Sequence, residues 1–405
     1  MLDQIDQEME KRNIQAIIIL GDTTLGDPNL TYVVGGSLAG GGLYFKRIRQ
    51  EPLLVTSILD APTAQKLSTV KRIETFTEWG LERLAQQYGR YEAKLHLLTE
   101  ILRKEGVDGK IVLYGRNDLG HGTYFVDMLR NLGVNVTGDN SPSVVDTARE
   151  TKDQKELEKL RDVGRRTGRV IEAIVDVLSS LKRKRGHLVL GKKRATIGAV
   201  KALISSNLAA EGLIAPEGTI FAIGASSADP HNAGAPSDAI KEGKLIVFDI
   251  FPQAESSYWC DITRTYIIGK ASKKDKQLYE TVHEAQKTCL DFIRPGVSGE
   301  EAMRKACDVI ERHGYHTIRE IYEGKAEKLD SGFNHILGHG VGLMIHELPI
   351  LGFLSKDPLR LGQVVTVEPG VYLPGYGGVR IEDTIAITPR GVNYLARVGR
   401  EFELT

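Results

Sequence analysis

The stretch Leu245–Ile268 reads LIVFDIFPQAESSYWCDITRTYII, and Val364–Ile387 reads VVTVEPGVYLPGYGGVRIEDTIAI. Each begins with an apolar run that reaches an acid, Asp249 or Glu368, and a second acid follows beyond a turn-rich loop, Asp261 or Glu382. Apolar alternation broken by Gly, Pro and Ser predicts a β-hairpin in each stretch. We interpret the two stretches as a duplicated strand unit. A pseudo-two-fold relation between them would direct four carboxylates at one place.

Carboxylates in such apolar strands indicate chemistry. A charged group in a buried strand is costly unless it is paired or binds a metal. A single buried acid would favour a salt bridge, here to Arg264 or Arg380. Four acids in two matched hairpins favour a metal site instead. Four carboxylates with one imidazole suit a pair of Mn, Co, Fe or Zn ions rather than a thiolate zinc site.

The histidines for such a site come from one run, HILGHGVGLMIHE, which contains His335, His339 and His346. Its glycines prevent a regular helix and allow the backbone to approach a ligand closely. The residues between the histidines are apolar, which indicates burial. Two further histidines, His231 in ADPHNAGAP and His121 between two glycines, are by themselves typical of loops.

The order of predicted elements divides the chain into two domains. Residues 1 to about 145 alternate helix and strand signals, with strands at 17–20, 52–56 and 111–114 and helices at 1–12 and about 80–105, which predicts an α/β domain. A charged helix from about Lys152 opens the second domain. Further helices are expected at about 273–293 and from a capping box at Ser298–Glu301 to Gly314. The glycine-rich stretch 35–42 lacks a phosphate-loop pattern and is interpreted as a hairpin turn.

Composition narrows the class of protein. The chain has 405 residues, with 53 basic and 53 acidic side chains, so its net charge argues against a nucleic-acid binder driven by bulk charge. The basic segment Lys182–Arg194 is expected to be an exposed loop or helix end, with a solvated surface favoured over a nucleic-acid site. The three cysteines suit free thiols, and neither a signal peptide nor a membrane span is expected. The cytosol is therefore the expected location.

Five motifs in order resemble the creatinase/prolidase/aminopeptidase P family of pita-bread metallopeptidases. They are DITRT (261–265), GHGVGL (338–343), HELP (346–349), EPGVY (368–372) and RIEDT (380–384). The resemblance implies an α+β protein with a creatinase/prolidase-like α/β N-terminal domain (1–148) and a pita-bread catalytic domain (149–405). It further implies a homodimer that acts on a peptide, while the composition described above is what argues against a nucleic-acid or membrane partner and favours the cytoplasm.

The resemblance also implies a role for each site residue. Asp249, Asp261, His339, Glu368 and Glu382 are expected to hold two divalent ions, with Asp261 and Glu382 bridging them; Mn or Co is favoured, with Zn or Fe as alternatives. His231, His346 and Glu368 are expected to be catalytic. His335 and Arg380 are expected to lie behind the ligands. The implied reaction is hydrolysis of the Xaa-Pro bond of dipeptides or peptide N-termini by a hydroxide that the metal pair generates.

Two departures and one alternative remain open. Most members separate the two aspartates by one residue fewer than the step from Asp249 to Asp261. Some dipeptidase members carry an arginine just after the HELP motif, where Ile350 stands here. A catalytically silent pita-bread module that binds other proteins is the alternative function. Such modules typically lose ligands, and all five are present here, as they would not be in a metal-free creatinase.

Overall fold

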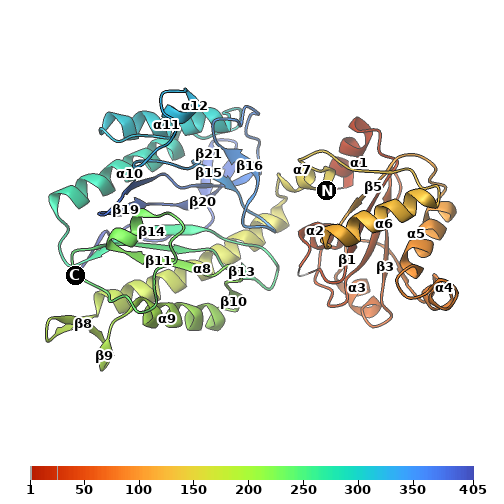
Figure 1. The fold of residues 1–405 in the computed structure, drawn as a ribbon, viewed down its shortest axis with the longest axis horizontal. Helices are drawn as coiled ribbons and strands as arrows, with labels where there is room; N and C mark the ends of the chain where they lie inside the picture. The colour runs from red at the N-terminus through yellow and green to blue at the C-terminus, as the bar shows by residue number, and fades with distance from the viewer. Residues whose placement is uncertain (1, 25) are drawn as a thin grey trace. The chain divides into compact units, whose positions relative to one another are not determined.

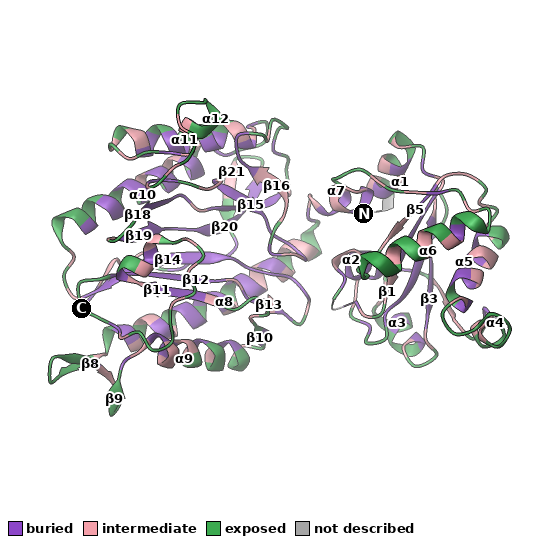
Figure 2. Cartoon of the chain, in the orientation of Figure 1, coloured by how far each residue is buried: buried purple, intermediate pink, exposed green. Residues whose placement is uncertain are grey.

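The computed structural model describes residues 2–24 and 26–405 and divides into two compact units, Met1–Arg149 and Glu150–Thr405. Figure 1 shows both units as combinations of helices and sheets. In both, strands are largely buried while helices expose their outer faces (Figure 2). Among the described residues, no helix combines the length and apolar character that crossing a bilayer requires. All three cysteines are buried and free, as expected.

The first unit is a mixed six-stranded sheet with helices around it. The strand order is β4-β3-β2-β1-β5-β6, with β1 antiparallel to β2 and parallel to β5. The strands are β1 (Ala16–Gly21), β2 (Gly42–Arg47), β3 (Leu53–Thr56), β4 (Arg72–Thr75), β5 (Ile111–Tyr114) and β6 (Val136–Thr137). The helices are α1 (Leu2–Lys11), α2 (Pro28–Val34), α3 (Ala61–Leu67), α4 (Leu81–Tyr88), α5 (Ala93–Lys104), α6 (Leu119–Asn131) and α7 (Val144–Arg149).

Two sequence predictions for this unit are wrong in detail. The single helix expected at 80–105 is two helices, α4 and α5, because the chain turns at Gly89, whose φ of +87° an L side chain rarely adopts. The glycine-rich stretch before β2 is not a hairpin turn, since it joins helix α2 to β2. Helix α2 begins at Asp27, whose side chain accepts from the N–H groups of Asn29 and Leu30, and ends at Gly35 with φ of +78°.

The second unit contains two similar halves. Each has a pair of helices followed by three strands in the same order. In the first half these are α8 (Gln154–Ser179), α9 (Ile197–Ala210), β11 (Thr219–Ile223), β12 (Leu245–Ile250) and β14 (Ile262–Ile268). In the second they are α10 (Lys273–Phe292), α11 (Gly299–Arg312), β15 (Gly338–Gly340), β17 (Val364–Val367) and β20 (Asp383–Thr388). The central strand pairs with both neighbours antiparallel in each half, so the duplicated strand unit expected from the sequence is present.

Other short elements complete the two sheets. In the first sheet the order is β11-β12-β14-β22, and in the second it is β16-β15-β17-β20-β21. The remaining elements are β7 (Lys182–Lys184), β8 (His187–Leu190), β9 (Lys193–Arg194), β10 (Leu213–Ile214), β13 (Gln253–Ala254), β16 (Glu347–Leu351), β18 (Gly370–Leu373), β19 (Gly377–Arg380), β21 (Gly391–Tyr394) and β22 (Glu403–Leu404), with the short helices η1 (Gly224–Ala228) and α12 (Arg319–Tyr322).

Capping explains where the long helices of this unit begin. Asp153, Ser272 and Ser298 each form a capping box with the acid three residues on, which satisfies N–H groups at the starts of α8, α10 and α11. The helix predicted from Ser298 is therefore confirmed, as are those beginning near residues 152 and 273. Helix α8 carries Gly164 against the Leu395 carbonyl, where a Cβ would lie 2.7 Å from that oxygen. A larger residue would push the helix away from the strand layer.

The buried side chain of Arg264 joins the two sheets. Its guanidinium donates to Asp383 Oδ1 at 2.6 Å and to the carbonyls of Thr263 and Glu382 at 2.9 and 2.6 Å. It also reaches the carbonyls of Val398 and Gly399. Arg264 lies on β14 and Asp383 on β20, so this one residue satisfies acceptors on both sheets.

We expect Arg264→Met to destabilise the second unit by about 1–3 kcal/mol or more, because Asp383 Oδ1 and the carbonyls of Val398 and Gly399 lose a donor, while Gln286 and Arg400 still donate to Asp383 Oδ2. Arg390→Met, which removes an exposed arginine of the same unit, is the matched control. Urea unfolding followed by circular dichroism measures both. A loss at Arg264 no larger than that at Arg390 would show that the junction does not depend on this side chain.

Candidate metal centre

Five side chains that the sequence singled out come from five different strands or strand ends. Asp249 lies on β12, Asp261 directly precedes β14 and His339 lies on β15. Glu368 directly follows β17, and Glu382 lies between β19 and β20. The first two therefore come from one half of the unit and the other three from the other half. The site lies where the two sheets meet.

Hydrogen bonds between β14 and β20 fix this meeting. The N–H of Asp261 donates to Thr384 Oγ1 at 3.2 Å, and that hydroxyl donates to the Asp261 carbonyl at 2.7 Å. In the other direction, the hydroxyl of Thr263 donates to Glu382 Oε2 at 2.7 Å, and the N–H of Glu382 donates to the Thr263 carbonyl. Each of these threonines therefore bonds the second acid of the opposite half: Thr263 bonds the Glu382 carboxylate, and Thr384 bonds the backbone of Asp261.

The two halves differ in register at their first acids. Asp249 lies opposite Thr263, whereas the residue opposite Thr384 is Thr366, two residues before Glu368. The longer step from Glu368 to Glu382 accounts for this offset. It places Asp249 within β12 but Glu368 just past the end of β17. The duplication is therefore complete in topology but not in which strand position carries the first acid.

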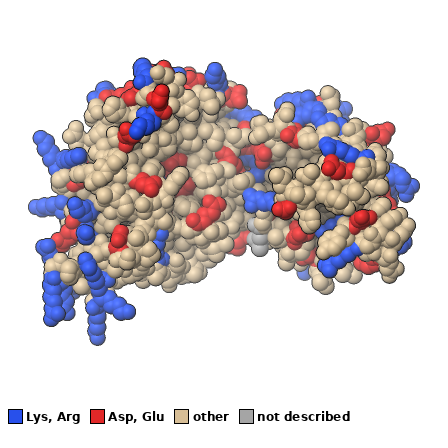
Figure 3. All heavy atoms as spheres, in the orientation of Figure 1, with Lys and Arg blue, Asp and Glu red and all other residues tan. Residues whose placement is uncertain are grey.

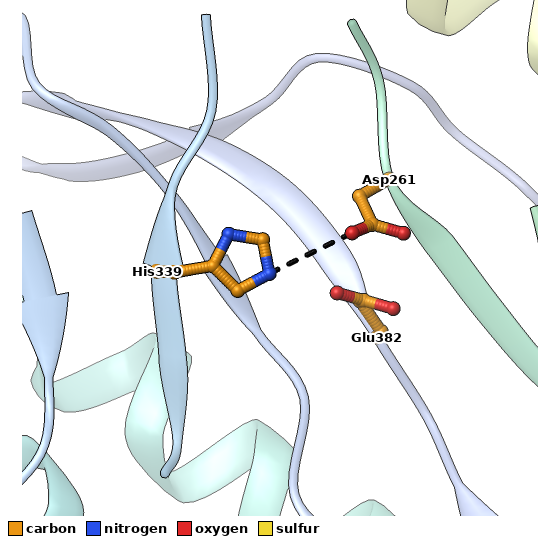
Figure 4. Close-up of side chains that lie close together, drawn as sticks. All are labelled: Asp261, His339 and Glu382. Atoms are coloured by element: carbon orange, nitrogen blue, oxygen red, sulfur yellow. Dashed lines mark ion pairs between the residues drawn. The ribbon is translucent and has the colours of Figure 1, made fainter. Parts of the chain in front are cut away.

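Asp261, His339 and Glu382 form a compact buried group. Each contributes one potential ligand atom, and these atoms lie within 4.8 Å of one another (Figure 4). His339 Nε2 is 3.6 Å from Asp261 Oδ2 and 3.3 Å from Glu368 Oε1. His339 Nδ1 lies 3.1 Å from the Gly340 carbonyl, which can only accept, so Nδ1 carries a proton. Its Nε2 is thereby the nitrogen directed at the acids, as metal-binding histidines require.

Asp249 lies outside this group in the structure. Its Oδ2 accepts from Arg380 Nη2 at 2.5 Å. Arg380 also donates from Nε to the Thr263 hydroxyl at 3.1 Å, so the guanidinium joins Asp249 to the residue that holds Glu382. The salt bridge that the sequence left open as an alternative for Asp249 is present. It accounts for only one oxygen of that carboxylate.

The acids raise one another's pKa. Burial raises the pKa of Asp261 well above its ordinary value, and the charges of Glu382, Asp249 and Glu368 add to this. Burial also raises the pKa of Glu382 well above its ordinary value, with Glu368 and Asp249 adding to it. The pKa of Asp249 is also raised by burial, and the charge of Arg380 opposes this. These carboxylates are costly to ionise together unless cations join them.

Glu368 behaves differently because a histidine faces it. Burial by itself would raise its pKa, but the hydrogen bond and charge of His339 lower the pKa of Glu368 to about 2. The hydroxyl of Thr366 also donates to Glu368 Oε1 at 3.1 Å. Glu368 is therefore the ionised carboxylate of the group.

Carboxylate oxygens without hydrogen-bond partners indicate whether these residues could bind metal ions. Asp249 Oδ1, Asp261 Oδ1 and Glu382 Oε1 are buried and have no hydrogen-bond partner among the described residues. An unpaired buried acceptor costs about 1–3 kcal/mol, and more when it is charged. Three such oxygens on neighbouring carboxylates, beside an imidazole Nε2, form a donor set that suits Mn, Co, Fe or Zn. The residues therefore fit divalent ions.

The other predicted site histidines surround this group. The ring of His346 packs edge-on against that of His339, with centroids 4.3 Å apart. Burial lowers the pKa of both His335 and His346. The loop of His231 lies beside the site, because the carbonyl of the preceding Pro230 accepts from Arg380 Nη1 at 3.2 Å. His231 itself is exposed on the loop after η1, and His121 lies exposed on α6 of the other unit.

Tyr372 is a residue of this site that was not singled out individually. Its buried hydroxyl accepts from Arg380 Nη1 at 3.0 Å and lies 3.0 Å from His335 Nε2. The Nδ1 of His335 lies 2.7 Å from the Ile336 carbonyl and so carries a proton, which leaves Nε2 to accept from the tyrosine. The sequence signal for its role was its position within the motif EPGVY. A tyrosine in an apolar strand is, however, more often a residue of the hydrophobic core.

A buried ion pair supports the segment that carries His346. Lys152 Nζ lies 2.5 Å from Glu347 Oε1, and both side chains are almost fully buried. The backbone N–H of Lys152 donates to the Gly362 carbonyl, at the start of the strand that leads to Glu368. The first residues of the second unit are thus bound to two segments of the site. The sequence showed Lys152 only as the start of a charged helix.

We expect Mn²⁺ to stabilise the metal-stripped protein against thermal unfolding. When the free Mn²⁺ concentration is a hundred times the dissociation constant, the free energy of unfolding should rise by about 2.7 kcal/mol. Glu382→Gln should abolish this gain and lower the bound metal measured by mass spectrometry. Without metal, the variant should be at least as stable as the parent, because one crowded carboxylate is gone. Glu280→Gln, which removes an exposed acid from α10, should behave as the parent does. An undiminished Mn²⁺ response in Glu382→Gln would exclude Glu382 as a ligand.

Comparisons with known proteins agree on one family. The model of Metallopeptidase family M24 matches residues 158–389. An Xaa-Pro dipeptidase of Pyrococcus horikoshii is 29% identical over 399 residues, which are 98% of this chain and 97% of that protein. An Xaa-Pro dipeptidase of Pyrococcus furiosus is 34% identical over 281 residues, covering 66% of this chain and 74% of its own.

Solved structures confirm the expected fold. The prolidase from Pyrococcus horikoshii OT3 has a TM-score of 0.75 at 28% identity, with 99% of both chains covered. The X-Pro aminopeptidase from Thermotoga maritima MSB8 has a TM-score of 0.76 at 24% identity, covering 98% of this chain and 99% of its own, and shows likeness of fold alone. The α+β pita-bread architecture is therefore confirmed. The chain belongs to metallopeptidase family M24 and is an enzyme of that family.

Proposed function

We propose that this enzyme hydrolyses the Xaa-Pro bond of dipeptides with the help of two divalent metal ions. The observation that carries the proposal is the buried group of Asp261, His339 and Glu382 with its unpartnered carboxylate oxygens. The substrate is inferred from two relatives that are named Xaa-Pro dipeptidases and match 98% and 66% of this chain. A silent binding module is not favoured, because such a module has no use for a costly carboxylate cluster.

The ligand assignment follows the donor set. Asp249, Asp261, His339, Glu368 and Glu382 are proposed as the residues that would hold the ions. Oxygen-rich ligation with one imidazole favours Mn or Co, with Zn or Fe as alternatives. When bound, such ions lower the pKa of water and polarise a carbonyl oxygen.

Glu368 is proposed to move the proton. In the reaction, the oxygen of water joins the carbonyl carbon, the bond to the proline nitrogen breaks, and a proton must reach that nitrogen. An amide nitrogen leaves poorly without it. In the metal-free protein His339 keeps the pKa of Glu368 low, so this carboxylate is ionised, and only the ionised form can accept the proton of the attacking water. We propose that Glu368 then passes the proton to the leaving nitrogen.

His231 and His346 are proposed to bind the substrate carbonyl and stabilise the developing negative charge. Burial lowers the pKa of His346, so its ring is neutral and can donate from one nitrogen. His335 and Arg380 are proposed to hold the acids in place. The chain of contacts from His335 through Tyr372 and Arg380 to Asp249 provides this support.

The substrate proposal concerns the proline ring and the free carboxylate of the dipeptide. The proline nitrogen carries no hydrogen, so the site is expected to recognise the ring rather than an amide donor. Ile350, at the position where some dipeptidase members carry an arginine, lies opposite His339 in the β15–β16 ladder. It supplies no charge to a free carboxylate there.

The remaining assignments concern the whole protein. We propose that residues 1–148 are a creatinase/prolidase-like domain without catalytic ligands and that residues 149–405 form the catalytic domain. We also propose a homodimer in the cytoplasm. Three buried free thiols are compatible with a reducing compartment.

We expect metal-loaded protein to cleave an Xaa-Pro dipeptide and metal-stripped protein to lose this activity and regain it with Mn²⁺ or Co²⁺. The parallel substrates are an Xaa-Pro-Xaa tripeptide and an Xaa-Ala dipeptide, each followed by release of the N-terminal amino acid. Cleavage of the tripeptide alone would replace dipeptidase by aminopeptidase activity. Equal cleavage of the Xaa-Ala dipeptide would overturn the proline assignment.

We expect Glu368→Gln to lower kcat by about 10²–10⁴-fold, the contribution of a positioned acid–base group. Bound metal is measured in the same preparation, so that loss of an ion can be separated from loss of proton transfer. Glu172→Gln, which removes an exposed acid from α8, is the control and should retain full activity. Near-normal turnover in the Glu368→Gln variant would remove Glu368 from the reaction.

A further inference from the structure

The link between α8 and α9 forms a small sheet that the proposed function does not use. Its three strands, β7, β8 and β9, pair antiparallel in the order of the sequence, so the expectation of a loop or helix end is wrong. Two-residue turns join the strands and make a compact element of residues 182–194, which we name the basic ribbon. Such turns form because their twist matches that of the strands.

The basic ribbon is an addition to the duplicated architecture. In the second half of the unit, α10 and α11 are joined by the short stretch 293–298, which contains no strand. In the first half, α8 and α9 are joined by 180–196, with three strands. Because the second half joins its two helices without such a sheet, the fold does not require the basic ribbon.

The charge of the basic ribbon is of one sign. It contains seven basic residues, all exposed: Lys182, Arg183, Lys184, Arg185, Lys192, Lys193 and Arg194. The sequence has no acid between Asp176 and Glu211. Arg183 lies 3.6 Å from Glu242, and this is the one ion pair of the ribbon found among the described residues. Figure 3 shows basic side chains projecting at the edge of the unit where Figure 1 draws β8 and β9.

Strand pairing places several of these cations on one face. Lys182 and Arg194 both lie opposite Val189, on the two sides of β8, and Lys184 follows two residues after Lys182. Cross-strand partners and alternate residues share a face of a sheet. The other face carries Leu188, which is buried. Lys182 and Lys184 are about 6.7 Å apart along the strand, and Lys182 and Arg194 about 10 Å apart across it.

The first turn of the ribbon retains a cation at a position that disfavours it. Arg185 has φ of +50° and Gly186 φ of +80°, the pair of left-handed conformations in which asparagine and glycine are preferred. A non-glycine residue there costs about 1 kcal/mol. An arginine at the tip of the hairpin is thus kept against a conformational preference. This supports a role for its side chain.

We propose that the basic ribbon binds the phosphate backbone of nucleic acid. Fixed rows of Lys and Arg at strand spacing match a linear polyanion, and arginine pairs with phosphate through two donors. A lipid surface is less suited, because the ribbon exposes no aromatic or large apolar side chain that could insert among head groups. The zero net charge of the chain does not oppose this, since the surplus is local.

The test measures fluorescence anisotropy of labelled nucleic acid with the full-length protein. The probes are a single-stranded RNA and a duplex DNA of about 20 nucleotides, long enough to span a site of this kind. With four phosphate contacts on single-stranded RNA, affinity should fall about 50-fold between about 50 and 200 mM salt. The triple variant K182Q/K184Q/R194Q should bind much more weakly, with its salt slope smaller by about 2.

A matched variant controls for net charge. K270Q/K287Q/K356Q removes the same number of positive charges from exposed lysines of the same unit. It should bind both probes as the parent does, and peptidase activity of both variants should equal that of the parent. Absence of parental binding at low salt would overturn the proposal, as would equal weakening in both variants. Binding only to vesicles that contain phosphatidylserine would replace nucleic acid by a membrane surface.

Discussion

The second unit depends on a junction at which two sheets meet beside a cluster of buried acids. Four buried carboxylates lie close together there, and burial, with the charges of the neighbouring acids, raises the pKa values of Asp249, Asp261 and Glu382, while His339 lowers that of Glu368. Two hydroxyls and two guanidinium groups hold the junction together: Thr263 donates to Glu382, Thr384 bonds Asp261, Arg264 bonds both strands and Arg380 pairs with Asp249. These side-chain bonds preserve a site that is electrostatically unfavourable until cations enter it. The buried acids lower the stability of this region in the absence of metal, and the same acids provide the ligands for metal. Residues of active sites often destabilise the fold in this way.

Much of this arrangement could be predicted from the sequence, because the signals were local. Capping boxes, apolar runs and turn residues depend on neighbours within a few positions, so the starts of α8, α10 and α11 and the strands that carry Asp249 and lead to Glu368 could be predicted. The repeated spacing around Asp249 and Glu368 also predicted the duplicated strands. The offset between the halves was less accessible. It depends on cross-strand register, which places Thr366 rather than Glu368 opposite Thr384. Register is set by tertiary pairing, and spacing counted along one chain does not determine it.

Contacts between distant segments account for what the sequence did not show. Tyr372 reads as a core residue until Arg380 and His335 are seen to share its hydroxyl. Lys152 reads as a solvated helix start until its ammonium is found buried against Glu347. In both cases a polar group is placed by partners far away in the chain. Helix α4 ends before α5 because Gly89 adopts a left-handed conformation, which is a local cause. The sequence did not predict this break, since helices also tolerate a single glycine in their interior.

The duplicated unit also shows where such an enzyme can change without losing its chemistry. The two halves agree in the helices and strands that bring the acids together, because any shift there would move a ligand. They differ in the segments that join these elements. The basic ribbon occupies one such joint, between α8 and α9, while the corresponding joint between α10 and α11 is short. An addition at this position extends the surface without entering the sheets. New binding properties are therefore expected in the segments that join the elements of the repeat, and the reaction itself at its centre, where the central strands of both halves carry or lead to the acids.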